Sequence, residues 1–268
     1  GPGSSPILWR DLLIVHCDGS DVQFIVALDK RDGHVVWKTL RTGKLESNPQ
    51  FKKAYGTPLV VEIGGEDVLI SPAANWLYGY QAATGRELWK VSYETLGFSN
   101  VPRPVLGNNR LFICTGFMKS ELLAIDFDPR QGEVAPLIAW RFGKQVPQIP
   151  SPLLIDNDLY FVSDQGGVFT CLDADSGAMV YRERLGGNHA ASPLLADGRI
   201  YLCDRAGTTH VIQPGRTFRL LATNRLKDGC MASPAAVAEG IYLRTTTALY
   251  RLSRGTDRTA ERVDPRLR

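Results

Sequence analysis

The stretch Ala27-Leu-Asp-Lys-Arg-Asp-Gly-His-Val-Val-Trp37 decides the fold, because its spacing of small, acidic, glycine and aromatic residues returns along the chain. The same spacing recurs in Gly79-Tyr-Gln-Ala-Ala-Thr-Gly-Arg-Glu-Leu-Trp89 and in Cys171-Leu-Asp-Ala-Asp-Ser-Gly-Ala-Met-Val-Tyr181. Ala124-Ile-Asp126 begins a fourth copy, whose turn is lengthened before Trp140. Self-similarity at intervals of roughly 20 to 50 residues indicates a repeat architecture.

Each residue type in this motif has a structural reason to be there. An Asp side chain accepts backbone N–H groups inside a turn, and Gly supplies a positive φ. The small residue allows close approach of neighbouring structure, and the terminal Trp offers a large apolar plate for packing between blades. We therefore interpret the motif as the turn between the third and fourth strands of a β-propeller blade.

A small residue followed by proline marks the start of each repeat. The pair occurs at Ser5-Pro6, Thr57-Pro58, Ser151-Pro152, Ser192-Pro193 and Ser233-Pro234, with Arg103-Pro104 in the remaining place. The steps between these prolines are 52, 46, 48, 41 and 41 residues. A four-stranded blade takes about 40–45 residues, so we expect one blade per repeat, with each proline beginning the innermost strand.

The repeat from Ser151 to Leu185 shows four strands most clearly. Short apolar or β-rich runs at 152–155, 159–162, 168–172 and 178–184 alternate with turns rich in Asp, Asn, Ser and Gly. This density of turns is typical of an antiparallel meander, and no helical periodicity lasts three turns. The predicted fold class is all-β, a propeller of four-stranded antiparallel blades. Six repeats lie at about 1–50, 51–97, 98–145, 146–187, 188–227 and 228–256.

The motif resembles the repeat of the quinoprotein-like (PQQ-like) β-propeller family, which includes quinoprotein alcohol dehydrogenases and non-catalytic propellers of the BamB type. The resemblance covers most of residues 1–252. The fifth repeat departs from it, with Gln213-Pro214-Gly215 in its third turn and Phe218 where a Trp is expected. This variant blade resembles repeat proteins of environmental bacteria such as planctomycetes.

The resemblance also bears on the two ends of the sequence. It implies a ring of seven or eight blades, so residues 1–256 are expected to be one propeller segment, with N-terminal blades missing. Its sixth repeat is expected to have three strands. Gly1-Pro2-Gly3-Ser4 fits either a cloning scar or the family's own lead-in. Residues 257–268 form a basic tail, which we interpret as a solvated end and not as a lipid- or anion-binding surface.

Bulk properties and known motifs exclude several function classes. A net charge of +3 does not point to nucleic acid, and no apolar run is long enough for a transmembrane segment. No leader typical of a signal peptide opens the sequence. Hydrolase, phosphate-loop and zinc-protease signatures are absent. The four histidines lack ligand spacing, and they are His16, His34, His189 and His210.

The cysteines read as buried apolar residues and not as a metal or disulfide framework. Five are present, never as a C-x-x-C pair, and they are Cys17, Cys114, Cys171, Cys203 and Cys230. Cys114 and Cys203 each lie ten residues after their proline. Because a whole blade separates them and a disulfide needs Cα atoms within about 7 Å, we expect both to be reduced.

Two patterns in the sequence bear on cofactor binding. Asp173-x-Asp175-x-Gly177 resembles the start of a calcium loop, but Ala178 and Arg184 occupy the places that need Gly and Glu. The family resemblance implies a quinone on the propeller axis, stacked against a Trp and often against an adjacent-cysteine disulfide. No Cys-Cys pair exists here. Trp37, Trp89 and Trp140 map to outer strands, which leaves Trp9 and Trp76. Trp76 either faces a partner or packs against its own blade.

These observations favour a non-enzymatic binding or scaffold propeller with no catalytic, cofactor-binding or metal residues. Its expected partner is a protein or a cell-envelope polymer, bound by the propeller loops. The resemblance implies a periplasmic or secreted location. The alternatives are a fragment of a PQQ-dependent quinoprotein oxidoreductase and a structural module of a larger multidomain protein. If the protein is an enzyme, the resemblance implies that it is a quinoprotein dehydrogenase.

Overall fold

The computed structural model describes residues 3–94, 97–128 and 135–253. The chain divides into two compact units, Gly1–Gln148 and Ile149–Arg268. The predicted all-β class is confirmed. The described residues form six antiparallel sheets, five of four strands and one of three, and their one helix is a short 3-10 turn, η1 (Pro49–Lys52).

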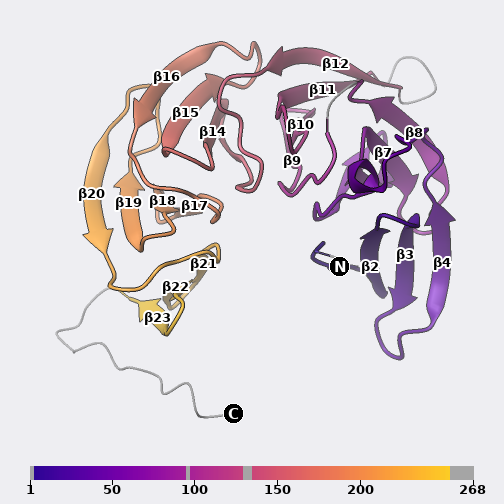
Figure 1. The fold of residues 1–268 in the computed structure, drawn as a ribbon, viewed down its shortest axis with the longest axis horizontal. Helices are drawn as coiled ribbons and strands as arrows, with labels where there is room; N and C mark the ends of the chain where they lie inside the picture. Colours follow the sequence, from indigo (N-terminus) through magenta and orange to yellow (C-terminus); the bar gives the residue numbers. More distant parts are fainter. Residues whose placement is uncertain (1–2, 95–96, 129–134, 254–268) are drawn as a thin grey trace. The chain divides into compact units, whose positions relative to one another are not determined.

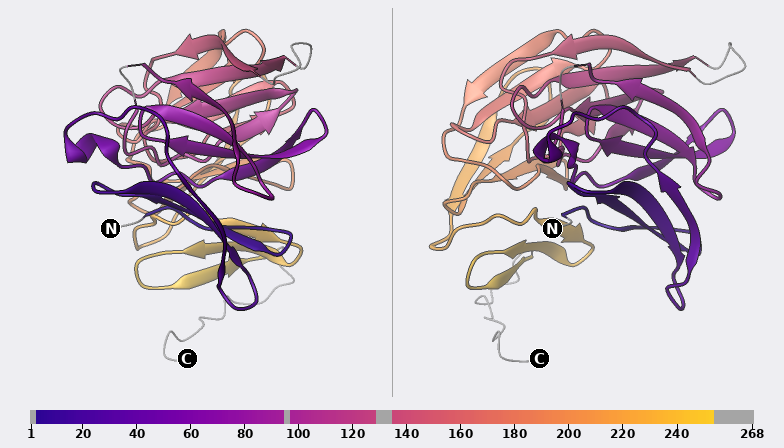
Figure 2. Two further views of the ribbon diagram at one scale, coloured as in Figure 1. Left: turned by 90° about the vertical axis from the view of Figure 1, so that its right-hand side faces the viewer. Right: turned by 45° about the vertical axis from the view of Figure 1, so that its right-hand side comes forward.

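The first unit holds three meanders, which we call sheets one to three (Figures 1 and 2). Sheet one contains β1 (Ile7–Trp9), β2 (Leu12–Asp18), β3 (Gln23–Asp29) and β4 (Val35–Leu40). Sheet two contains β5 (Leu59–Ile63), β6 (Glu66–Ala73), β7 (Trp76–Gln81) and β8 (Glu87–Ser92). Sheet three contains β9 (Val105–Gly107), β10 (Arg110–Cys114), β11 (Leu122–Asp128) and β12 (Ala135–Phe142).

The second unit holds sheets four to six. Sheet four contains β13 (Leu153–Ile155), β14 (Asp158–Val162), β15 (Val168–Asp173) and β16 (Met179–Arg184). Sheet five contains β17 (Leu194–Ala196), β18 (Arg199–Cys203), β19 (Thr208–Ile212) and β20 (Leu220–Arg225). Sheet six contains β21 (Ala235–Val237), β22 (Gly240–Arg244) and β23 (Leu249–Leu252). In all six sheets the marker proline stands directly before the first strand, which forms one edge of the sheet. The basic tail at 257–268 lies outside the described residues.

The motif turn forms as its residue types predict. Asp29 Oδ1 accepts the Arg31 N–H at 2.8 Å, and Asp173 Oδ1 accepts the Ser176 N–H at 3.0 Å. The motif glycines have positive φ, 77° at Gly33, 70° at Gly85 and 70° at Gly177. Asp173 is thus used by the blade turn, in agreement with the structural interpretation of that segment. The centre of the lengthened turn before Trp140 lies outside the described residues.

A β-bulge follows the small motif residue in five sheets and fixes which side chain lies opposite it. The register shifts immediately after Ala27, Gly79, Ala124, Cys171 and Val211. In sheets one to four the cross-strand partner of the small residue is aromatic: Trp37, Trp89, Trp140 and Tyr181. The close approach is measurable at Gly79, where an added Cβ would stand 2.1 Å from Trp89 Cε2. In sheet two the observed geometry thus leaves no room for a Cβ opposite the indole, whereas sheets one and three place Ala opposite Trp.

Sheet five shows that the predicted role of Phe218 is wrong. The cross-strand partner of Val211 is Ala222, so the aromatic place on β20 is held by a methyl group and the small place by the larger residue. Phe218 lies before β20 and packs on sheet four, with its ring centroid 5.8 Å from that of Tyr181. The residue at the aromatic position is therefore Ala222, four residues after Phe218, because the unusual turn before Phe218 changes the spacing of the motif. Every residue of β20 is exposed.

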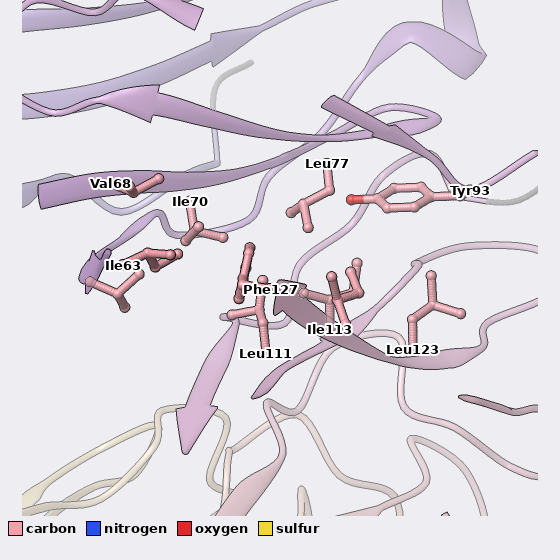
Figure 3. Packing of buried hydrophobic residues seen from close by; sticks show 11 residues of the cluster. Ile63, Val68, Ile70, Leu77, Tyr93, Leu111, Ile113, Leu123 and Phe127 are labelled. Carbon is pink, nitrogen blue, oxygen red and sulfur yellow. The ribbon is translucent and has the colours of Figure 1, made fainter. Parts of the chain in front are cut away.

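Apolar side chains fill the space between consecutive sheets within each unit. Figure 3 shows the cluster between sheets two and three, built around Leu77, Tyr93, Leu111 and Phe127. The aromatic plate of one sheet contributes to the seam with the next: Trp37 belongs to the cluster of sheets one and two, and an added Cβ on Gly85 would meet Trp37 Cε3 at 2.4 Å. This packing confirms the inter-blade role predicted for the motif Trp.

Candidate functional site

Three phenylalanines from separate loops of the first unit meet on one surface. The Phe51 and Phe98 ring centroids are 4.7 Å apart, and those of Phe98 and Phe117 are 5.7 Å apart in an edge-to-face arrangement. Phe117 is 52% exposed and the adjoining Met118 is 69% exposed. We call Phe51, Phe98, Phe117 and Met118 the aromatic platform. Adjoining exposed apolar side chains often mark an interaction site, whereas single exposed apolar side chains are common on any protein surface.

Backbone hydrogen bonds join the loops that carry the aromatic platform. The Phe117 N–H donates to the Phe98 oxygen at 2.9 Å, and the Ser99 N–H donates to the Lys53 oxygen at 2.6 Å. Phe51 belongs to η1, where Asn48 Oδ1 accepts the Gln50 N–H at 3.0 Å and caps the turn. The loops are thus held together before any ligand arrives.

A cavity of about 340 Å³ lies beside the same segment. Lys53 and Tyr55 form one wall, and the β2–β3 hairpin forms the other, with Asp21 and Phe24 among its residues. Its lining combines an aromatic surface with the basic Lys53 and the acidic Asp21, whereas Asp18, also at its wall, keeps its side chain buried. Segment 51–55 therefore borders both the aromatic platform and this cavity.

A buried ion pair stands behind the cavity. Asp18 and Arg41 are joined at 2.7 Å, and each side chain is only 1% exposed. Arg41 also donates to Ser71 Oγ at 2.6 Å and to the Tyr80 hydroxyl at 3.2 Å. Because the guanidinium is held by carboxylate, hydroxyl and aromatic partners, it positions the backbone around Asp18 and is not available to a ligand.

His16 lies next to this ion pair and is 1% exposed. Its Nε2 is 2.9 Å from Ser71 Oγ. Burial, followed by the positive charge of Arg41, holds the pKa of His16 well below its ordinary value of 6.5, although the Gly56 backbone acts in the opposite direction. The imidazole is therefore neutral near pH 7, which suits a structural residue.

The other residues singled out in the sequence are engaged in packing or turns. The Trp76 indole N–H donates to the Lys44 oxygen at 2.9 Å, so Trp76 packs under the connection from sheet one. His189 is buried between the Cys203 and Gly186 carbonyls, at 3.0 and 3.2 Å. Both side chains are therefore held by contacts within the protein.

One group of three possible metal ligands occurs among the described residues: Asp29, Asp32 and His34, whose ligand atoms lie within 4.8 Å of one another. Both carboxylate oxygens of Asp29 accept from the Arg31 guanidinium, at 3.0 and 2.7 Å. This contact lowers the pKa of Asp29 far below its usual range. A cation here must displace Arg31, so we assign these residues to the blade turn.

A larger groove of about 1000 Å³ lies in the second unit, between the first hairpins of sheets five and six. Asp197 and Arg199 on one side pair with each other at 3.1 Å. The opposite wall includes Glu239 and runs to Ser253, where the described residues end. Its charged side chains are spread over both hairpins, and on the second of them Arg251 donates to the Glu239 carbonyl at 3.3 Å. They do not converge on a point, so this groove is a weaker candidate than the aromatic platform.

The residues that the family resemblance would assign to a quinone do not fit that cofactor. Trp37, Trp89 and Trp140 lie opposite small residues within the sheets, and Trp76 is bonded under a loop. The five cysteines are separate thiols, and no two are adjacent in sequence. Trp9 packs against the buried cluster of sheets one and two, and the Arg10 guanidinium carbon lies 4.6 Å from its ring centroid. Among the described residues all five indoles are thus engaged in packing, and no vicinal disulfide is present for stacking.

Comparison with known proteins relates this architecture to a known family of β-propellers. The profile of the family described as "Outer membrane protein assembly factor BamB" matches residues 73–217, more than half of the chain. The chain belongs to the PQQ-like β-propeller repeat family. No curated protein matches its sequence. None of the helices among the described residues of this PQQ-like propeller has the length and apolar character needed to cross a membrane.

Solved structures share the fold of this PQQ-like propeller at low sequence identity. BamB from Moraxella catarrhalis is 13% identical, with a TM-score of 0.64, over 90% of this chain and 68% of that one. A quinohemoprotein alcohol dehydrogenase from Comamonas testosteroni is 14% identical, with a TM-score of 0.61, over 84% of this chain and 43% of that one. A europium-containing methanol dehydrogenase has a TM-score of 0.65 at 12% identity, over 90% of this chain and 64% of that one. These likenesses concern the fold alone.

Proposed function

We propose that this PQQ-like propeller is a non-enzymatic binding protein of the cell envelope, periplasmic or secreted, that recognises a partner protein through the aromatic platform. The observation that carries the proposal is the exposure of Phe117 and Met118 on loops that are already bonded together. Aromatic side chains dominate the energetics of protein interfaces, and a site ordered in advance loses less entropy on binding.

The surroundings of the aromatic platform support a protein partner. Lys52 and Lys53 follow Phe51, and Lys119, with a side chain 79% exposed, follows Met118. An apolar centre with a charged rim is the usual anatomy of such an interface. The description of the matched family as an outer membrane protein assembly factor supports an envelope location for the partner.

Site-specific photo-crosslinking tests the proposal. A photoreactive phenylalanine analogue at position 117 or 118 is expected to give one discrete adduct with the same envelope protein. The analogue at Leu137, which is 70% exposed on β12 of the same unit, serves as the control and is expected to give none. Equal adducts from all three positions, or none from 117 and 118 when the full envelope fraction is present, would reject the aromatic platform as the site.

A further inference from the structure

Two thiols meet between sheets five and six of the second unit. Cys203 is the last residue of β18, and Cys230 lies four residues before the proline that precedes β21. They are 1% and 2% exposed. Both belong to one buried cluster, with Ala191 and Leu243. The pair therefore bridges two sheets that are otherwise joined by few buried side chains.

The two thiols share one buried cluster and interact with each other. A hydrogen bond between the two thiols raises the pKa of Cys203 and lowers that of Cys230. The Thr209 hydroxyl oxygen lies 3.3 Å from Cys203 Sγ, within hydrogen-bond distance. Cys230 Sγ lies 3.3 Å from the carbonyl oxygens of Ala232 and Arg244. Burial nonetheless raises the pKa of both thiols, that of Cys203 to about 11.

We propose that Cys203 and Cys230 are a redox modification site, at which a small disulfide compound oxidises the two thiols to a disulfide that links sheets five and six. The Cys230 thiolate attacks the oxidant, releases its first thiol and forms a mixed disulfide. The Cys203 thiolate then attacks Cys230 Sγ and releases the second thiol. Two protein thiols are oxidised, and one disulfide molecule is reduced to two thiols.

Sheet six gives the oxidant its access. All three residues of β21 are exposed, and in β22 only Leu243 is buried. A sheet with so few buried contacts opens more readily than its neighbours, and opening uncovers Cys230. The disulfide closes the loop from 203 to 230 and restricts this opening. The inference is independent of the proposed binding function, because the aromatic platform lies in the first unit.

Thiol counting on the full chain tests the inference. After incubation with excess oxidised glutathione, removal of the oxidant and unfolding, the number of free thiols is expected to fall from five to three. The mass of the protein should fall by two hydrogens, and a peptide map should show the 203–230 link. Dithiothreitol should restore five thiols. Resistance of sheet six to limited proteolysis should rise in the oxidised form.

The controls use a matched cysteine in sheet three. Cys114 ends β10 as Cys203 ends β18, but Gln148 holds the place that corresponds to Cys230. Cys114→Ser is therefore expected to lose two thiols on oxidation like the wild type. Cys230→Ser should lose none, whereas Cys203→Ser should stop at the mixed disulfide on Cys230, lose one thiol and gain the mass of one glutathionyl group. An unchanged count of five in the wild type, even in mild urea that opens sheet six, would overturn the proposal. A link mapped to another cysteine would do so as well.

Discussion

At Gly79 the absence of a Cβ atom allows the Trp89 indole to pack against the backbone of the neighbouring strand. The cross-strand partner of Gly79 is Trp89, and an added Cβ would stand 2.1 Å from the indole ring. Gly79→Ala must therefore displace the ring or the strand. Overpacking of a core costs about 1–3 kcal/mol, and we expect a loss at the upper end of that range, measured as the free energy of unfolding in urea.

Gly143→Ala is the matched control for this substitution. An added Cβ at Gly143 approaches nothing closer than 3.8 Å, at Glu121. We expect its free energy of unfolding to change by less than about 0.5 kcal/mol. Equal effects of the two alanines would show that contact with the indole ring is not what requires a glycine at 79.

The Asp18–Arg41 ion pair gives a second prediction. Asp18→Ala leaves the guanidinium of Arg41 buried without its carboxylate, since that side chain is 1% exposed. Removing one partner of a buried pair costs about 3–5 kcal/mol. The control is Asp67→Ala, whose partner Arg10 has a side chain 70% exposed, and for which a loss below about 1 kcal/mol is expected. Similar urea midpoints for the two variants would contradict the structural role of Arg41.

His16 predicts a dependence of stability on pH. The folded-state pKa of His16 is lowered by burial and by Arg41, so the unfolded chain binds the proton more readily. The free energy of unfolding therefore falls as the pH drops below about 6.5, by about 1.4 kcal/mol for this group at pH 5.5 relative to pH 7.5. His16→Gln should remove this part of the slope, and His34→Gln, with an exposed ring, should retain it. Identical slopes in all three proteins would show that His16 does not titrate on unfolding.

Among the elements, sheet five differs from the other four-stranded sheets in its pair Val211–Ala222. Ala222→Trp alone should be destabilising by about 1–3 kcal/mol, because Val211 occupies the space of the ring. Val211→Gly combined with Ala222→Trp recreates the arrangement of Gly79 and Trp89. A double-mutant cycle in urea should give a favourable coupling of at least about 1 kcal/mol. Additive effects would mean that the pairing is not steric in origin.

The elements were predictable wherever a motif residue acts through its local backbone. The acceptor role of Asp173, the positive φ of Gly33 and the inter-sheet place of Trp37 all follow from turn chemistry and residue size. The assignment of Phe218 was wrong because an altered turn moved the strand relative to the counted spacing. In sheets one to four the bulge follows a small residue. In sheet five it follows Val211, whose size does not mark the position.

At the scale of the molecule, the aromatic platform was missed for a different reason. Phe51, Phe98 and Phe117 come from three connections and share no periodicity or motif, so only the folded backbone brings them together. Exposed Met118 has no sequence signal that distinguishes it from a core methionine. The useful indication would have been that Phe51 and Phe117 fall outside the expected strands.

The whole chain is expected not to bind pyrroloquinoline quinone as a redox cofactor. The motif tryptophans are used in packing, and the five thiols include no adjacent pair. Titration of the purified chain with the quinone and calcium, followed by fluorescence and calorimetry, should show no saturable binding. Micromolar affinity together with dye-linked alcohol oxidation would favour the oxidoreductase alternative.

The inverted pair in sheet five also constrains how these repeats diverged. If the blades arose by duplication of one ancestral unit, Gly or Ala opposite Trp had to become Val opposite Ala. Enlarging the small residue first meets the indole ring, as the 2.1 Å approach at Gly79 shows. The order that avoids this clash replaces the aromatic residue by a small one first. The intermediate then has two small residues opposite each other and a cavity between them. Living relatives that retain such a loosened blade would record the intermediate step.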